Sequence, residues 1–197
     1  MPAASQEKLL TFGVQGGVPA QTPLQESDRI PFVVGPNLNF RLLSSLSVQT
    51  GVLFHRMGQQ GNDSAFLYPV DSLTLAHFEQ RGRAIEIPIL AKYYVTGERR
   101  TWRPFVTAGP TIRQTSLHYS YFSSVLGGSP LGSTANSQPF PDRTSHQWNV
   151  DPAAGIGVDI RAGRFHLEPE ARYSYWGAGT NDPIRKNQVD FLLGFRF

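Results

Sequence analysis

The chain has 197 residues, a length typical of one domain, and no linker-like stretch divides it. It has no cysteine, which excludes a disulfide framework, a zinc knuckle and a thiol nucleophile. Its formal net charge is +3 and its basic residues are scattered, so we expect no nucleic-acid-binding patch.

The first eight residues have neither the charged region nor the apolar region of a signal peptide. We expect residues 1–8 to be disordered. If the protein is exported, we expect Met1 to stand at the start of a mature sequence. No stretch of about 18 consecutive apolar residues follows, which excludes a conventional membrane-spanning helix.

Three segments between residues 10 and 55 alternate apolar and polar residues, the period of a β-strand with two unlike faces. Their apolar positions are Leu10, Phe12, Val14 and Val18, then Val34, Leu38, Phe40 and Leu42, then Leu46, Val48, Val52 and Phe54. Their opposite positions include Thr11, Gly13, Gln15, Gly35, Asn37, Asn39, Arg41, Ser47, Gln49, Gly51 and His55.

Five further segments, at 85–95, 105–113, 148–160, 165–176 and 188–197, show the same alternation, least clearly at 105–113. The last one has Val189, Phe191, Leu193, Phe195 and Phe197 on one face. No pattern with a period of 3.6 residues competes with these segments. The sequence therefore predicts an all-β protein.

The polar faces indicate which side of the sheet is inside. They are rich in glycine and carry charges of both signs, which suits the crowded, dry lumen of a narrow barrel. The predicted lumen charge network is Arg41, Glu86, Lys92, Arg113, Asp151, Asp159, Glu168, Glu170, Arg172, Asp190 and Arg196. We predict a closed antiparallel up-and-down transmembrane β-barrel of about eight strands. The alternative is a soluble lipocalin-like ligand-binding barrel with its apolar face inward.

Long connections, near 19–31, 57–82, 116–146 and 177–187, alternate with short ones, at 44–45, 96–103 and 161–164. Membrane barrels have short periplasmic turns and longer outer loops. We therefore expect all four long loops on the outside, where they offer a surface to an unidentified partner. Aromatic residues then fall near the two ends of the barrel, as interfacial belts would.

Five prolines, Pro36, Pro88, Pro110, Pro152 and Pro169, fall inside the predicted strands. Proline donates no hydrogen bond to a ladder, and a closed barrel has no idle edge. We expect bulges, or strand portions above the membrane, to accommodate some of them.

Two stretches resemble a known family. Glu86-Ile-Pro-Ile-Leu-Ala-Lys-Tyr-Tyr94 and Arg103-Pro-Phe-Val-Thr-Ala-Gly-Pro110 resemble the small outer-membrane protein β-barrel family, related in architecture to OmpX and the membrane domain of OmpA. Phe197, preceded by Val189, Phe191, Leu193 and Phe195, looks like the C-terminal signal read by the barrel-assembly machinery. The resemblance implies a place in the bacterial outer membrane.

Cross-strand pairing about the turns places Glu86 near Arg113 and Glu168 near Arg196. Such pairs either gate an ion path or plug the lumen structurally. The interior of a barrel of about eight strands is filled by side chains, which favours the plug and argues against a general diffusion porin.

His118-Tyr119-Ser120 is the one indication of an enzyme. A histidine and a serine two residues apart share a strand face, and this pair resembles the His-x-Ser element of lipid A deacylases. Such enzymes also need a carboxylate to orient the histidine; the nearest in sequence are Glu98 and Asp142, at unmatched spacing. The other histidines show no metal-ligand spacing, and we expect no cofactor.

We therefore predict a monomeric barrel in the bacterial outer membrane with a structural or surface-interaction role. Its expected partners are outer-membrane lipid and lipopolysaccharide, and the barrel-assembly machinery during insertion. The alternatives are a lipid A-modifying enzyme that uses His118 and Ser120, and the soluble ligand-binding barrel.

Overall fold

A computed structural model describes residues 9–20, 31–67, 72–97, 100–127, 135–139, 143–177 and 186–197. These residues form ten strands. They are β1 (Leu10–Pro19), β2 (Phe32–Arg41), β3 (Leu46–Gly51), β4 (Leu53–Leu67), β5 (Ser72–Tyr94), β6 (Trp102–Gly127), β7 (Ala135–Pro139), β8 (Arg143–Ala162), β9 (Phe165–Tyr175) and β10 (Asn187–Arg196). In this part of the chain no helix is long and apolar enough to cross a membrane.

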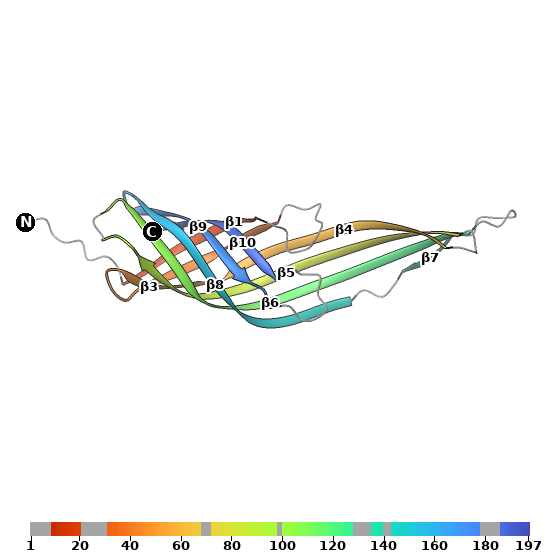
Figure 1. Cartoon of the computed structure of the whole chain (residues 1–197), viewed down its shortest axis with the longest axis horizontal. Coiled ribbons are helices and arrows are strands. Elements are labelled where there is room, and N and C mark those ends of the chain that lie inside the picture. Colours follow the sequence, from red (N-terminus) through yellow and green to blue (C-terminus); the bar gives the residue numbers. More distant parts are fainter. Residues whose placement is uncertain are drawn as a thin grey trace, which may run out of the picture.

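The sheet closes on itself, because β1 pairs with β2 on one side and with β10 on the other. β3 and β4 are one wall strand, since both keep the same register against β2 and against β5, with a break at Val52. β7 pairs only with β6, outside the closed wall. The predicted closed antiparallel barrel of eight strands is therefore confirmed (Figure 1).

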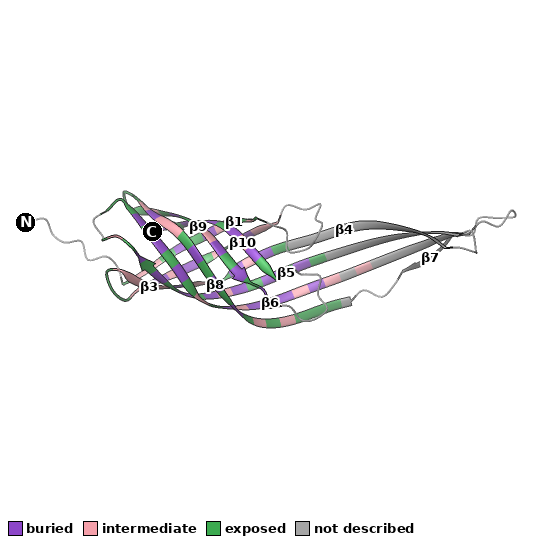
Figure 2. Ribbon diagram, in the orientation of Figure 1, coloured by how far each residue is buried: buried purple, intermediate pink, exposed green. Residues whose placement is uncertain are grey.

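The two faces of the wall are the reverse of those in a soluble barrel. Outward-facing Val150 and Ile156 are 70% and 66% exposed, whereas inward-facing Lys92 and Arg113 are 0% and 1% exposed. Figure 2 shows buried and exposed residues alternating along the strands. This alternation follows from the two-residue period of a strand between an apolar solvent and a polar lumen.

The barrel has a short-turn end and a long-connection end. The β2–β3, β5–β6 and β8–β9 turns lie at the first, and Figure 1 shows the C-terminus there as well. The β8–β9 turn is the tightest, because Ala162 pairs directly with Phe165. Gly163 in this turn has a φ of 67°, a conformation that favours glycine.

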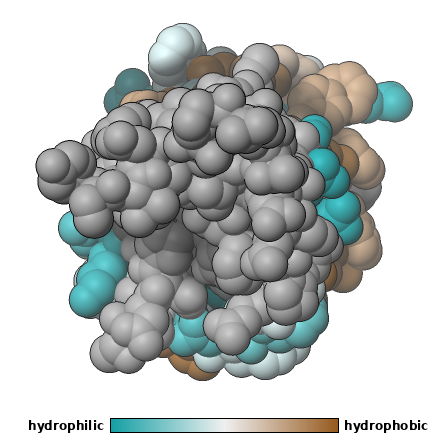
Figure 3. Space-filling view, turned by 90° about the vertical axis from the view of Figure 1, so that its right-hand side faces the viewer, coloured by the Kyte–Doolittle hydropathy of each residue, from teal (hydrophilic) through white to brown (hydrophobic). Residues whose placement is uncertain are grey.

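At the other end the strands run further than predicted. β4 and β5 stay paired from Met57↔Gly82 to Leu67↔Ser72, and β6 accompanies β5 to Gly127. The predicted loops at 57–82 and 116–146 are thus wrong in form, since much of each is paired strand that projects to the right in Figure 1. We call this extension of β4, β5 and β6 the strand arm. Figure 3, viewed from that side, shows hydrophobic and hydrophilic residues around the rim.

Some predicted segments lie outside the described residues. These are residues 1–8, expected to be disordered, residues 21–30 of the first long loop and residues 178–185 of the last.

Four of the in-strand prolines coincide with short gaps in the ladders. The β5–β6 ladder skips from Pro88↔Thr111 to Ala91↔Ala108, beside Pro110. Similar gaps flank Pro36 between β2 and β3/β4, Pro88 between β5 and β3/β4, and Pro169 between β8 and β9. The regular pairing is therefore interrupted where a donor is missing, although the Val52 nitrogen still donates to the Pro36 carbonyl oxygen at 3.1 Å. The register is the same on both sides of each gap, so these interruptions are neither the bulges nor the strand portions above the membrane that were expected.

Pro152 is accommodated differently. It lies directly opposite Pro110 in the continuous β6–β8 ladder. In the non-hydrogen-bonded pairs of an antiparallel ladder, both nitrogens point away from the partner strand. The two prolines therefore cost the β6–β8 ladder no hydrogen bond.

Glycine makes these gaps possible. A Cβ on Gly109 would collide with the carbonyl oxygen of Ile89, and a Cβ on Gly35 would collide with that of Val52. Each glycine lies next to a proline at one of these ladder gaps, where a carbonyl oxygen of the neighbouring strand points toward it. Only a residue without a side chain allows this close approach.

Candidate functional site

Inward-facing charged side chains form three clusters along the lumen. The first, toward the long-connection end, is centred on Arg113. Its Nη2 lies 3.0 Å from Glu86 Oε2 and its Nη1 lies 2.8 Å from Asp151 Oδ2. Arg113 is a β6 residue, with Glu86 on β5 and Asp151 on β8 as flanking neighbours. One buried guanidinium therefore ties three adjacent wall strands together.

Aromatic and histidine side chains complete this first cluster. The Arg113 guanidinium lies 3.9 Å from the centre of the Trp176 ring, a favourable cation–π distance. His55 Nε2 lies 3.3 Å from Glu86 Oε2, and its ring meets that of Trp176 edge-on. Asp151 also accepts a hydrogen bond from the Gly177 backbone at 2.8 Å, which anchors the chain leaving β9.

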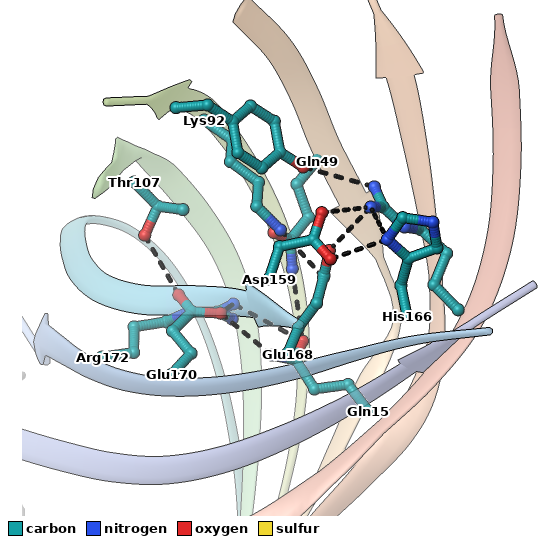
Figure 4. Close-up of polar contacts among 11 residues, drawn as sticks. Gln15, Gln49, Lys92, Thr107, Asp159, His166, Glu168, Glu170 and Arg172 are labelled. Atoms are coloured by element: carbon teal, nitrogen blue, oxygen red, sulfur yellow. Dashed lines mark hydrogen bonds and ion pairs between the residues drawn. The ribbon is translucent and has the colours of Figure 1, made fainter. Parts of the chain in front are cut away.

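The second cluster, in the middle of the barrel, surrounds Glu170 (Figure 4). Arg172, two residues along β9, binds both of its oxygens, at 3.0 and 2.8 Å. Thr107 and Gln15 donate to the same carboxylate at 3.0 Å each, from β6 and β1. Gln49 of β3 donates to Gln15 at 3.4 Å, which extends the network across the lumen.

The third cluster lies toward the short-turn end. Lys92 Nζ is 2.8 Å from Glu168 Oε2, and Arg196 Nη2 is 3.1 Å from the other oxygen of Glu168. Arg196 also pairs with Asp159 at 2.8 Å, and His166 lies 2.7 Å from Asp159 on its other side. The residues come from β5, β8, β9 and β10, so the cluster spans the lumen (Figure 4).

Nearly all the predicted lumen residues belong to these clusters. Glu86 and Arg113 meet as adjacent-strand counting suggests, and Arg196 reaches Glu168 diagonally, because its direct partner is His166. Asp190 faces the lumen opposite Arg172 but makes no ion pair within 4 Å among the described residues. Arg41 lies apart from the clusters, half-buried at the short-turn mouth.

The polar faces predicted from the sequence already contain the lumen residues Gln15, Gln49, His55, Tyr94, Thr107 and His166, outside the predicted charge network. Two further lumen residues, Arg103 and Trp176, were not placed on a face from the sequence. The parity of their strands would have placed both inside.

The predicted insertion motif lies on the outward face of β10 and just beyond it. Phe191, Leu193, Phe195 and Phe197 are all exposed, and Phe195 packs against Phe165 at a centroid distance of 5.1 Å. This face is available to lipid.

His118 and Ser120 share the outward face of β6, as predicted from their spacing. His118 lies on the far side of the apolar wall from the short turns, and its Nδ1 is 3.3 Å from the Thr144 hydroxyl. Glu98 and Asp142, the carboxylates considered as its orienting partner, lie outside the described residues. Among the described residues no group of three or more His, Cys, Asp or Glu side chains is placed to hold a metal.

A sheet closed on itself, apolar outside and ion-paired inside, defines a transmembrane β-barrel, since lipid tolerates no unpaired sheet edge. The chain belongs to the family described as outer membrane protein beta-barrel domain, which matches residues 4–178. The predicted family is thus confirmed, and with it the bacterial outer membrane as the location.

Solved structures of small outer-membrane barrels are similar to this chain. The N-terminal β-barrel domain of Pseudomonas aeruginosa OprF is 12% identical, with a TM-score of 0.50 over 95% of this chain and 96% of that one. Neisserial surface protein A is 13% identical, with a TM-score of 0.47 over 95% and 94%. Ail of Yersinia pestis is 10% identical, with a TM-score of 0.45 over 95% and 96%. The OprF likeness shows the fold alone. The chain has no match among curated protein sequences.

Proposed function

We propose that the protein is a monomeric outer-membrane barrel with a plugged lumen and a structural or surface-interaction role, and that it is neither a general porin nor an enzyme. The observation that carries the proposal is the set of buried ion pairs. At two levels, charged side chains from different strands meet at 2.8–3.1 Å, and between them Arg172 and Glu170 of β9 meet at 2.8 Å. A dry lumen crossed by paired charges makes a rigid wall and leaves little room for solutes.

The outer surface supports the same proposal. Short turns of membrane barrels face the periplasm, so the strand arm points away from the cell. An arm built on three continuous wall strands displays its outer end at a fixed place, as recognition surfaces on rigid scaffolds do. We include an unidentified surface partner of this arm in the proposal.

An arginine pair just above the apolar wall fits outer-leaflet lipid. Arg56 and Arg83 are exposed, directly opposite each other on β4 and β5, next to the apolar pair Phe54 and Ile85. Like charges placed this way repel each other unless an anion lies between them. Among the described residues neither has a carboxylate within 4 Å. The phosphate groups of lipopolysaccharide would supply the anion at this level.

The plug is tested by a swelling assay on proteoliposomes. The refolded protein should first show faster migration in SDS before boiling than after it, the behaviour of a closed barrel. Vesicles that contain it should then not swell in an isosmotic sugar solution, whereas vesicles with a general porin should. Swelling at a comparable rate per inserted barrel would contradict the plugged lumen. Absence of the heat-dependent band shift would contradict the membrane barrel itself.

The enzymatic alternative gives a separate prediction. Ser120→Ala is expected to leave the lipid A of expressing cells unchanged, because neither Glu98 nor Asp142, the carboxylates nearest in sequence to His118, matches the spacing of the deacylase element. Mass spectrometry of lipid A from cells with the wild type, the variant and the empty vector measures this. Loss of an acyl-chain change that the wild type produces would establish the enzyme instead.

A further inference from the structure

A cavity of about 720 Å³ opens at the short-turn mouth of the barrel. The basic residues around it are Arg41, Arg103, Arg161, Arg164, His166 and Arg196, and among the described residues no Asp or Glu side chain lines it. This differs from the lumen beyond it, where carboxylates face the arginines and Lys92. Arg196 and His166 belong to the third cluster, where they face Asp159, and Arg41, Arg103, Arg161 and Arg164 add positive charge to the mouth.

Arg103 is the residue that distinguishes this cavity. It is 5% exposed, and its Nη2 donates to the Ser44 carbonyl oxygen at 3.0 Å. The guanidinium stacks 4.1 Å from the centre of the Tyr94 ring, and its Nε has no hydrogen-bond partner in the part of the chain that the structure describes.

No carboxylate among the described residues lies within 4 Å of Arg103. Its cross-strand neighbour Asp159 is already bound by Arg196 and His166. A buried cation with a free donor and no counter-ion is costly unless an anion completes it.

The shape and chemistry of the walls indicate what that anion is. A guanidinium presents donors in a planar fork that matches the oxygens of a carboxylate or a phosphate. Leu43, Tyr94, Phe165 and Phe197 add apolar surface to the same cavity. Its volume lies within the range of about 300–1,000 Å³ that small-molecule sites occupy.

We propose that this cavity binds a small organic anion, with a phosphate or carboxylate group on Arg103 and an apolar body against the aromatic walls. Residues of two turns, Leu43–Ser44 and Gly163–Arg164, line the cavity, which places it at the end of the barrel that faces water, so the ligand is a solute from the aqueous side. That side is the periplasm in the orientation proposed above. Binding itself depends neither on that orientation nor on the plug.

The test is isothermal titration of phenyl phosphate into the refolded full chain in a neutral detergent at low ionic strength. Phenyl phosphate should bind the wild type, and Arg103→Gln should weaken the binding by about ten- to a hundredfold, the usual effect of losing one charge-assisted hydrogen-bonding group. Arg100→Gln is the matched control, since Arg100 is exposed on the neighbouring turn and does not line the cavity. Its affinity should equal that of the wild type.

Three results would overturn the proposal: no saturable binding, equal binding of neutral benzyl alcohol, or equally tight binding of inorganic phosphate. Absence of saturable binding would mean that the cavity is not a binding site. Equal binding of benzyl alcohol would mean that the ligand need not be an anion, and equally tight binding of inorganic phosphate would mean that it needs no organic body. Each variant is accepted only if it shows the heat-dependent shift in SDS. If Arg103→Gln does not refold, Arg103→Lys decides, because lysine keeps the charge but not the planar fork. Unchanged affinity in that variant would also overturn the role of Arg103.

Discussion

Replacing Arg113 with methionine is expected to lower the free energy of unfolding by about 3–5 kcal/mol, the usual penalty for leaving a buried charge without its partner. The substitution leaves the carboxylates of Glu86 and Asp151 in the lumen without their guanidinium partner. It also removes the guanidinium from the Trp176 ring. Denaturant titration of the protein refolded in phospholipid vesicles, followed by tryptophan fluorescence, measures the change.

The matched control is Arg83→Met, which removes an exposed, outward-facing arginine from the neighbouring strand. Its effect should stay within about 0.5 kcal/mol. The triple variant Arg113→Met, Glu86→Gln, Asp151→Asn should recover most of the loss, because no unpaired charge remains. If Arg113→Met lowers the free energy of unfolding no more than Arg83→Met does, the lumen at this level contains water, and the proposal of a plugged lumen is contradicted.

The second large effect concerns the outer wall. Ile156 lies on the outward face of β8, midway between Trp148 and the β8–β9 turn, and is 66% exposed. Ile156→Arg should lower the free energy of unfolding in vesicles by about 2–4 kcal/mol, the depth-dependent penalty for arginine at the bilayer midplane. The same titration in vesicles measures it.

His146→Arg serves as the control, because His146 is exposed on the same strand and face but beyond Trp148. At that level arginine should change the free energy of unfolding by at most about 1 kcal/mol. Equal effects of the two substitutions would mean that the wall between them does not cross a hydrocarbon layer.

The face assignment could be predicted from the sequence because one physical contrast repeats along every wall strand. In β10, Phe191, Leu193 and Phe195 need lipid, and Asp190 and Arg196 need partners, so only one orientation satisfies both. The same reasoning predicted the pairing of Glu86 with Arg113, since these residues lie on adjacent strands joined by a short turn.

The strand arm could not be predicted by the same means. Alternation reports a difference between the two sides of a sheet, and beyond the bilayer both sides face water. The stretch from Gly58 to Ser64 is therefore polar at nearly every position although its backbone is fully paired. A polar segment without hydrophobic periodicity is predicted to be a loop when only the sequence is known.

Contacts across the lumen, between strands that are not neighbours, could not be predicted from the sequence either. Arg196 of β10 meets Asp159 of β8, two strands away, and Gln15 of β1 meets Glu170 of β9. Such pairs depend on how the closed wall curves and on the stagger between strands, which local pairing rules do not specify. Arg103 could have been placed inside from the sequence, because it has the same parity as Thr107 on its strand.

The shared register of the strand arm determines how this protein can serve as a display scaffold. Gln59 is paired with Gln80, and Gln80 with Tyr119, so a cut at one level of the arm defines a matching cut in all three strands. Joining residue 59 to residue 80 through a short turn would preserve every pairing closer to the barrel, provided that β6 is trimmed beyond 119. Removing one residue from a single strand would instead turn the faces of everything that follows. Foreign peptides are therefore best grafted in place of segments cut at the same level in β4, β5 and β6.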